Sequence, residues 1–444
     1  MPTPAHRIRR TATLLVLALG AFACSSDDEG AVGTTGAAAA TDSALTTVIA
    51  PIAGDTATAV APSTEPTATA PATSEMVATT EPATTEPATT AVETSSPPVE
   101  LASPGALGPY GVGRTTVTMT DETRARPLTV DVWYPIAPGT VGVPSIYSFA
   151  PGIEFPSTVA LADAPVGGGG PYPLVVYSHG SGGVRYVASF FTEALASHGF
   201  VVAAPDHAGN TATEVLLGGA ATFEVNAVNR PLDVTFVIDE LLAKAADPAD
   251  ALAESIDARR IGVAGHSFGG YTALAGVSGV TVDGTAVPAE TRIGAIVAMA
   301  PATERLTDAE LAAVDVPAML MVGTADRSTP VDPNVTRSWA LMQGTPRYRV
   351  ELADAGHQSF TDVCQYQRDL PTLPAVPQFL IDAVDVYALE ACGPELMPIA
   401  RAHELTNTYA ISFFLAELAG APGYAAFIDP AAVTTPDVTV QRDD

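Results

Sequence analysis

Between residues 105 and 425 the chain alternates short apolar runs with longer amphipathic stretches. Near-continuous runs of Val, Ile, Leu and Ala are typical of strands buried on both faces of a parallel sheet. Apolar side chains repeat with helical spacing in Val187–Ser197, Pro231–Lys244 and Leu405–Leu418. The expected strands of this sheet are Leu174–Tyr177, Phe200–Ala204, Ile261–Ala264, Ile293–Met299, Ala318–Val322 and Tyr348–Leu352. This alternation predicts an α/β fold with a mostly parallel, doubly wound sheet and flanking helices.

Two segments near the start of this region have a different pattern, because polar and apolar residues alternate along them. Thr115–Met119 and Leu128–Tyr134 are therefore expected to form an antiparallel pair. Residues 426–444 are expected to be a C-terminal tail, so the predicted α/β domain covers residues 105–425.

The N-terminal quarter of the chain indicates export. A basic start and a short apolar run predict an export signal over residues 1–24, since the run is too short to span a membrane. It ends at Cys24 in a sequence that resembles a bacterial lipobox, although Ala21 stands where Leu is usual. We expect a lipidated Cys24 at the cell surface, with secretion after cleavage near the same place as the alternative. Residues 25–104, rich in Ala, Thr, Pro and Glu, predict a disordered stalk.

The charge composition of the chain excludes one class of binding partner. The chain has 49 acidic and 20 basic residues, a formal net charge of −29. Nucleic acid is therefore not an expected partner, because phosphate binding needs cationic patches. If Cys24 carries lipid, Cys364 and Cys392 remain as a pair in an oxidising compartment, where a disulfide between them is expected.

Candidate chemistry begins at the pattern Gly265-x-Ser267-x-Gly269, which follows the strand Ile261–Ala264 and precedes a helix-prone run. A serine on a sharp strand-to-helix turn exposes its hydroxyl, and the glycines permit the turn. Serine needs a base and an orienting acid to act as a nucleophile.

Two histidines follow Ser267, and His357 is the candidate base because it lies on a Gly-containing loop after the last predicted strand, whereas His403 starts an apolar helix. The candidate acid is Asp326, the first carboxylate after the strand Ala318–Val322; Asp332 is the alternative, more simply a helix cap. All these positions follow strand ends and can meet at one sheet edge.

An acyl-transfer site also needs donors for the developing oxyanion. We expect them to be the backbone N–H groups of Phe268 and of Ser181, the latter on the Gly-rich loop after the strand Leu174–Tyr177. His179 is expected to pack beneath that loop.

The chain resembles the dienelactone-hydrolase-like branch of α/β-hydrolases, near platelet-activating-factor acetylhydrolases and cutinase-like polyester hydrolases. This resemblance implies the α/β-hydrolase fold and a serine esterase that uses Ser267, Asp326 and His357. Ser267 replaces the cysteine of dienelactone hydrolases, and Ala302 stands where similar polyester hydrolases carry tryptophan. The resemblance rests on Asp131-Val-Trp-Tyr-Pro135, Tyr177-Ser-His-Gly180, Leu195-Ala-Ser-His-Gly-Phe200, Arg230-Pro-Leu-Asp233, Gly265-His-Ser-Phe-Gly-Gly270 and Ala355-Gly-His357.

Residues 208–228 and 361–400 are read as local insertions beside the site. The predicted function is therefore carboxylic ester hydrolysis by a monomer that needs no cofactor or metal and contacts the membrane only through its lipid anchor. A phospholipid acetylhydrolase or a polyesterase is the alternative; a serine peptidase, an acyltransferase and an idle binding module are further ones.

Overall fold

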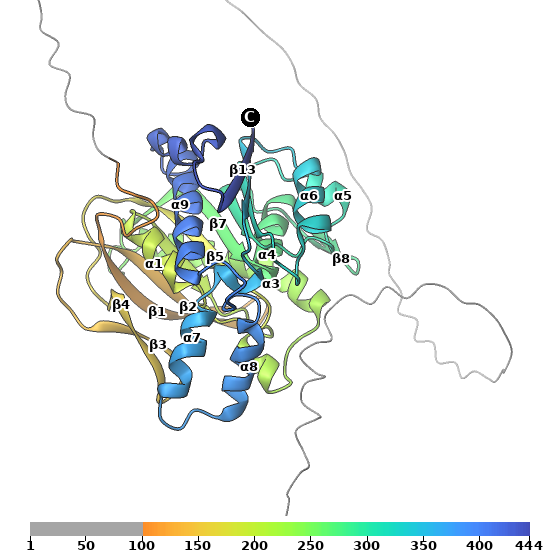
Figure 1. The fold of residues 1–444 in the computed structure, drawn as a ribbon. Helices are drawn as coiled ribbons and strands as arrows, with labels where there is room; N and C mark the ends of the chain where they lie inside the picture. Colours follow the sequence, from red (N-terminus) through yellow and green to blue (C-terminus); the bar gives the residue numbers. More distant parts are fainter. Residues whose placement is uncertain (1–100) are drawn as a thin grey trace, which may run out of the picture. The chain divides into compact units, whose positions relative to one another are not determined.

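The computed structural model describes residues 101–444, so the predicted export signal, Cys24 and nearly all of the predicted stalk lie outside the described residues. One sheet of eleven strands runs through this part, in the order β13-β12-β11-β10-β7-β5-β6-β2-β1-β4-β3 (Figure 1). Its strands are β1 (Gly111–Asp121), β2 (Arg126–Ile136), β3 (Pro144–Ala150), β4 (Ile153–Ala162), β5 (Tyr172–Ser178), β6 (Val201–Pro205), β7 (Ile256–His266), β10 (Ile293–Met299), β11 (Ala318–Gly323), β12 (Arg347–Leu352) and β13 (Val438–Asp443).

The centre of the sheet is parallel from β6 through β5, β7, β10 and β11 to β12. Side chains of β5 alternate between two cores: Val175 and Tyr177 face one, and Leu174 and Val176 face the other. Both sets are buried, which explains the continuous apolar runs in the sequence. The predicted α/β-hydrolase fold, a mostly parallel sheet with flanking helices, is thereby confirmed.

Helices cover both faces of the sheet (Figure 1). The helices α1 (Ser189–Ser197) and α9 (Ile399–Glu417) contribute to one core, and α3 (Phe223–Ala246) and α4 (Phe268–Ser278) to the other. The other α-helices of the described part are α2 (Ala212–Leu216), α5 (Asp308–Ala312), α6 (Val331–Leu341), α7 (Val363–Asp369) and α8 (Gln378–Ala388). No helix among residues 101–444 has the length and apolar character needed to cross a bilayer.

The predicted antiparallel pair is present as β1 and β2, and β2 continues antiparallel to β6. The hairpin of β3 and β4 was not predicted. In β3 the inward positions include Ser145, which accepts a hydrogen bond from Arg114 at 2.7 Å, while Ile146 points outward and is 42% exposed. Its pattern is therefore inverted at this pair of positions, and β4 contains Pro156, a residue unusual within a strand. A small extra hairpin joins β8 (Val280–Val282) to β9 (Thr285–Val287).

The expected C-terminal tail requires a correction, because residues 438–443 form β13, which pairs antiparallel with β12 at the sheet edge. Val438 and Val440 are buried, whereas the residues between and after them are exposed. A charged end of the chain can therefore supply an edge strand, since only alternate side chains need to be apolar.

One helix boundary differs from the sequence-based prediction. Helix α3 begins at Phe223 rather than at Pro231, which lies inside it and only removes one backbone donor. The two predicted insertions contain α2 and the pair α7 and α8, which lie side by side in Figure 1.

Candidate active site

Ser267 lies between the end of β7 and the start of α4, with φ 56° and ψ −115°. This left-handed backbone is rare for a residue with a side chain, and such strain is stored at functional sites. The flanking glycines are sterically required: a Cβ on Gly265 would overlap the carbonyl of Gly269, and one on Gly269 would overlap the carbonyl of Ser178. The pattern Gly-x-Ser-x-Gly thus reflects close backbone packing around an exposed hydroxyl.

The structure brings Ser267, His357 and Asp326 together. The Oγ of Ser267 lies 2.9 Å from Nε2 of His357, and Nδ1 of His357 lies 2.8 Å from Oδ2 of Asp326. A carboxylate accepts only, so His357 carries its proton on Nδ1, and its Nε2 is free to accept the serine proton. His357 and Asp326 are 4% and 6% exposed, which leaves Ser267 as the accessible member of the three.

Asp326 is held by the turn that follows β11. Its Oδ1 accepts hydrogen bonds from the backbone N–H groups of Ser328 and Thr329, at 2.9 and 2.7 Å. The hydroxyl of Thr329 lies 3.0 Å from Oδ2 of Asp326 and 2.9 Å from the carbonyl of Ala300. The carboxylate therefore has one oxygen fixed by the backbone and the other directed at His357.

The backbone of His357 is held by the histidine of the elbow itself. Nε2 of His266 donates to the carbonyl oxygen of His357 at 2.8 Å, and the two rings lie 4.7 Å apart. Burial lowers the pKa of His266 well below its usual range, and the neighbouring His357 lowers it further. His266 is consequently a neutral structural donor that links β7 to the loop after β12.

The expected oxyanion donors lie on either side of Ser267. The amide of Phe268 is the first of α4, a position whose N–H has no acceptor within its own helix. Gly180 packs against the nucleophile, because a Cβ added to it would lie 3.4 Å from Cβ of Ser267. Ser181 follows on the exposed side of this loop.

The two rival residues do not join this arrangement. His403 stacks on Phe190 with ring centroids 3.5 Å apart, and its Nε2 donates to the carbonyl of Thr361 at 3.0 Å. Asp332 is exposed at the start of α6. The predicted alternatives are thus placed in packing and surface roles.

The second predicted insertion packs directly on the loops that carry Asp326 and His357. The carbonyl of Glu390 accepts from the N–H of Gln358 at 3.0 Å, and its carboxylate accepts from the hydroxyl of Ser328 at 2.9 Å. The Cys364–Cys392 disulfide, as predicted, closes this segment two residues after Glu390. The insertion therefore braces the site from outside the sheet.

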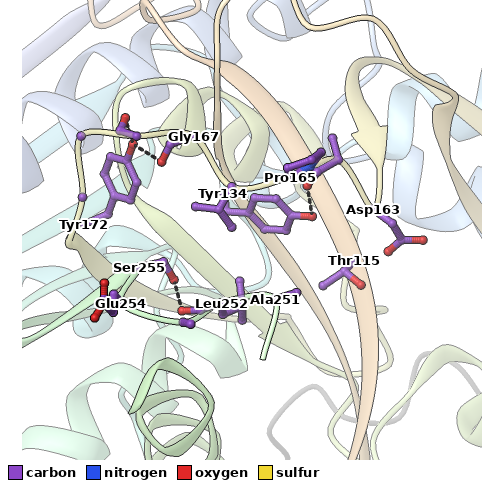
Figure 2. A pocket seen from close by; sticks show the side chains of 16 residues that line it. Thr115, Tyr134, Asp163, Pro165, Gly167, Tyr172, Ala251, Leu252, Glu254 and Ser255 are labelled. Atoms are coloured by element: carbon purple, nitrogen blue, oxygen red, sulfur yellow. Dashed lines mark hydrogen bonds between the residues drawn. The ribbon is translucent and has the colours of Figure 1, made fainter. Parts of the chain in front are cut away.

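A cavity of about 710 Å³ lies at the amino ends of the parallel strands, beside Tyr172 at the start of β5 and Ser255 just before β7 (Figure 2). The hydroxyl of Tyr134 donates to the carbonyl of Ala164 at 2.8 Å, and that of Tyr172 to Gly168 at 2.7 Å. Ser267 and His357 follow the carboxyl ends of the strands, so this cavity is separate from them. Ligands of parallel sheets bind at the carboxyl ends, which favours the edge with Ser267.

Comparisons with known proteins agree with this architecture. The family model described as platelet-activating factor acetylhydrolase, isoform II, matches residues 156–218. Two relatives with that name, from Canis lupus familiaris and Bos taurus, are 30% and 28% identical over 180 and 153 residues. These matches cover 31% and 27% of this chain and 40% and 34% of the relatives, so the chain spans less than half the length of the curated relatives it matches.

A solved structure extends the likeness over a larger part of the chain. The ferulic acid esterase from Streptomyces cinnamoneus is 26% identical, with a TM-score of 0.55, over 74% of this chain and 96% of the other. The fold and this neighbour define the chain as an α/β-hydrolase. The relatives and this neighbour are named as ester hydrolases, and the predicted resemblance to platelet-activating-factor acetylhydrolases is found over the matched part of the chain.

Several residues around the site were not assigned a role from the sequence. Thr329 and His266 act through contacts between segments far apart in the chain, which a linear pattern does not show. For His266 a signal existed, since it occupies the variable position before the serine of the elbow.

Proposed function

We propose that the protein is a serine carboxylic ester hydrolase with Ser267 as nucleophile, His357 as general base and acid, and Asp326 as the orienting carboxylate. One observation carries the proposal: a strained, accessible Ser267 lies 2.9 Å from the unprotonated nitrogen of His357, whose other nitrogen is 2.8 Å from a buried carboxylate. This arrangement lowers the cost of forming a serine alkoxide and has no packing function that requires the positive φ.

In the first half-reaction the Oγ of Ser267 attacks the ester carbonyl while Nε2 of His357 takes its proton. The tetrahedral intermediate expels the alcohol, which receives the proton from His357, and leaves an acyl group on Ser267. Water then attacks the acyl-enzyme, His357 again taking and returning a proton, and the carboxylic acid departs. Asp326 stays ionised and stabilises the imidazolium in both steps.

The backbone N–H groups of Phe268 and Ser181 are proposed to hold the oxyanion in both steps. Their support is their position on the two sides of the nucleophile and the glycine at 180, which allows close approach.

Short acyl esters are the proposed substrates. The support is the similarity to proteins named platelet-activating factor acetylhydrolase, which act on an acetyl ester by their name. Ala302 at the site of the tryptophan of similar polyester hydrolases speaks against aromatic polyesters. The predicted profile over p-nitrophenyl esters falls with acyl length; a maximum at long chains would favour a lipase instead.

The activity itself is tested with Ser267→Ala and the matched Ser278→Ala. Both serines flank α4, but the hydroxyl of Ser278 contacts only the carbonyl of Gly279, at 2.9 Å. Hydrolysis of p-nitrophenyl acetate should be lost in the first variant and retained in the second. Full activity of Ser267→Ala would refute the assignment, and a wild type inactive on every ester would favour an idle binding module.

We also propose that the enzyme is exported and tethered at the cell surface through lipid on Cys24. The support is the basic start, the short apolar run and the lipobox-like sequence before Cys24. Mass spectrometry of the mature N-terminus should find Cys24 first and acylated. A chain that begins elsewhere, or an unmodified Cys24, would leave a secreted protein.

A further inference from the structure

The loop that carries Ser181 lies over a buried polar cluster that the proposed reaction does not use. The cluster consists of Ser178, His179, His207, Asn210, Arg230 and Asp233, all nine-tenths or more buried. Arg230 and Asp233 come from α3, Ser178 ends β5, and the others lie in the loops after β5 and β6. A buried charged cluster of this kind is costly unless every partner is in place, so its retention requires a reason.

His179 contacts the peptide group that contains the proposed oxyanion donor. Its Nδ1 lies 2.7 Å from the carbonyl oxygen of Gly180, and its Nε2 accepts the backbone N–H of His207 at 3.2 Å. Because Nε2 accepts, the single ring proton of a neutral His179 must be on Nδ1. Burial lowers the pKa of His179 well below its usual range, with the Arg230 charge adding to the effect, so the ring is neutral.

The Gly180 carbonyl and the Ser181 N–H belong to the same planar trans peptide and point in opposite directions. The carbonyl is held twice, by His179 Nδ1 at 2.7 Å and by the N–H of Gly183 at 3.1 Å. Holding the carbonyl on the inner side therefore fixes the N–H of Ser181 on the outer side. Gly180 itself packs against Ser267, so the peptide that carries the Ser181 N–H begins beside the nucleophile.

Arg230 secures both ends of the same loop. Its guanidinium donates to the carbonyl of His179 and, at 3.0 Å, to the hydroxyl of Ser178. It also donates to Oδ1 of Asn210 at 2.9 Å, and Nδ2 of Asn210 contacts Oγ of Ser181 at 3.2 Å. The tip and the base of the loop are thus tied to one rigid group on α3.

Hydrogen bonds connect Arg230 with the other members of the cluster. The hydroxyl of Ser178 donates to Nε2 of His207 at 2.9 Å, and Nδ1 of His207 donates to Asp233 at 2.9 Å. Burial lowers the pKa of Arg230 to about 9, against the opposing effect of Asp233, so the guanidinium stays charged at neutral pH. The carboxylate of Asp233 also pairs with Arg124 and Arg126, at 2.8 and 2.7 Å, so it is the anion shared by several cations beneath the loop.

We propose that His179 is the positioning residue of the oxyanion hole: its Nδ1–H holds the Gly180 carbonyl and so aims the Ser181 N–H at the reacting ester, with Arg230 and Asn210 fixing the loop. This inference rests on the proposed ester hydrolase function. A positioned donor acts on the transition state more than on bound substrate, so its loss lowers kcat and kcat/KM together and leaves KM nearly unchanged.

The test compares two substitutions of the same histidine in the full exported chain. In His179→Asn the side-chain amide can place a donor near the former Nδ1, whereas in His179→Gln it reaches only the former Nε2. With p-nitrophenyl acetate, His179→Gln should lose on the order of 10- to 100-fold in kcat with KM within about threefold, and His179→Asn should recover most of it. His198→Asn is the control, since it removes another buried histidine contact, 3.0 Å to the carbonyl of Ala106.

The outcomes separate the alternatives. Thermal unfolding and near-ultraviolet circular dichroism report the folded fraction of each variant. A loss of kcat that only follows the folded fraction, or equal activity of His179→Gln and wild type, would overturn the inference. If both variants at position 179 fail to fold, Asn210→Ala is measured instead. The inference then predicts a lower kcat with a nearly unchanged KM for this variant, and an unchanged kcat would overturn it. A wild type without esterase activity would refute the proposed function instead, whereas an active wild type with unaffected variants refutes only the positioning role.

Discussion

Replacing Asp326 with Asn should disable the proposed active site while leaving the fold in place. Oδ1 of Asp326 accepts two backbone N–H groups, from Ser328 and Thr329, and an amide nitrogen cannot take that place. The Asn oxygen must therefore face the backbone, and its NH₂ group must face His357. The NH₂ group of the Asn then donates to Nδ1 of His357. Because Nδ1 must accept this hydrogen bond, the single proton of the neutral ring moves to Nε2.

That tautomer cannot take a proton from Ser267. Loss of the correct tautomer in a Ser-His-Asp site typically lowers kcat by about 10⁴, which corresponds to ~5.4 kcal/mol of transition-state stabilisation. The stability of the fold should change far less, by about 1 kcal/mol, because the backbone bonds to the turn survive. The activity loss is therefore expected to exceed any loss of folded protein by several orders of magnitude.

The assay is hydrolysis of p-nitrophenyl acetate by Asp326→Asn and by Asp332→Asn, with urea unfolding of each. Asp332 is an exposed carboxylate six positions further on. Its replacement with Asn makes the same change of charge at a residue that does not contact His357. The reasoning predicts full activity for Asp332→Asn. Near-normal kcat in folded Asp326→Asn, or inactivation by Asp332→Asn alone, would refute it.

Three further results are expected. Gly265→Ala should lower the free energy of unfolding by at least about 2 kcal/mol and abolish activity, because the added Cβ overlaps a carbonyl. Gly276→Ala in α4 is the control: its added Cβ lies 3.5 Å from the nearest atom, so thermal unfolding should show no loss or a gain of stability. Replacing both cysteines of the Cys364–Cys392 disulfide, which closes 28 positions, should lower the free energy of unfolding by about 3–4 kcal/mol relative to the oxidised wild type. Relative to the reduced wild type, the same substitution should have no effect. Burial raises the pKa of Asp362 to about 7 from 3.8, so the native state keeps a proton that the unfolded chain loses, and stability should fall by up to ~4 kcal/mol as pH rises from about 4 to 7. Urea unfolding of Asp362→Asn should show a flatter pH dependence; a slope equal to that of wild type would contradict the cause given.

The parallel core and the site residues could be predicted because both depend on short-range patterns. The central strands are apolar on both faces, and Ser267, Asp326 and His357 each follow a predicted strand in the order typical of the fold. The strand ends bring them to one edge without any knowledge of long-range contacts. The structure adds the distances, which no sequence pattern contains.

The parts that could not be predicted depend on contacts between distant segments. Ser145 faces the interior because Arg114 accompanies it, and this exchange inverts the pattern of β3. The strand β13 has only two buried positions, so a short charged segment gives a weak signal. The cluster beneath Ser181 joins β5, the loop after β6 and α3, and its polar residues become informative only when their partners are known.

The central claim is that Ser267 is the nucleophile of an ester hydrolase, and covalent labelling tests it most directly. The wild type is incubated with a fluorophosphonate and digested, and the labelled peptide is identified by mass spectrometry alongside the loss of esterase activity. We predict one adduct per chain, on Ser267, formed in parallel with inactivation and absent from Ser267→Ala. Inactivation with an adduct on another residue, or an active enzyme that takes up no label, would contradict the account.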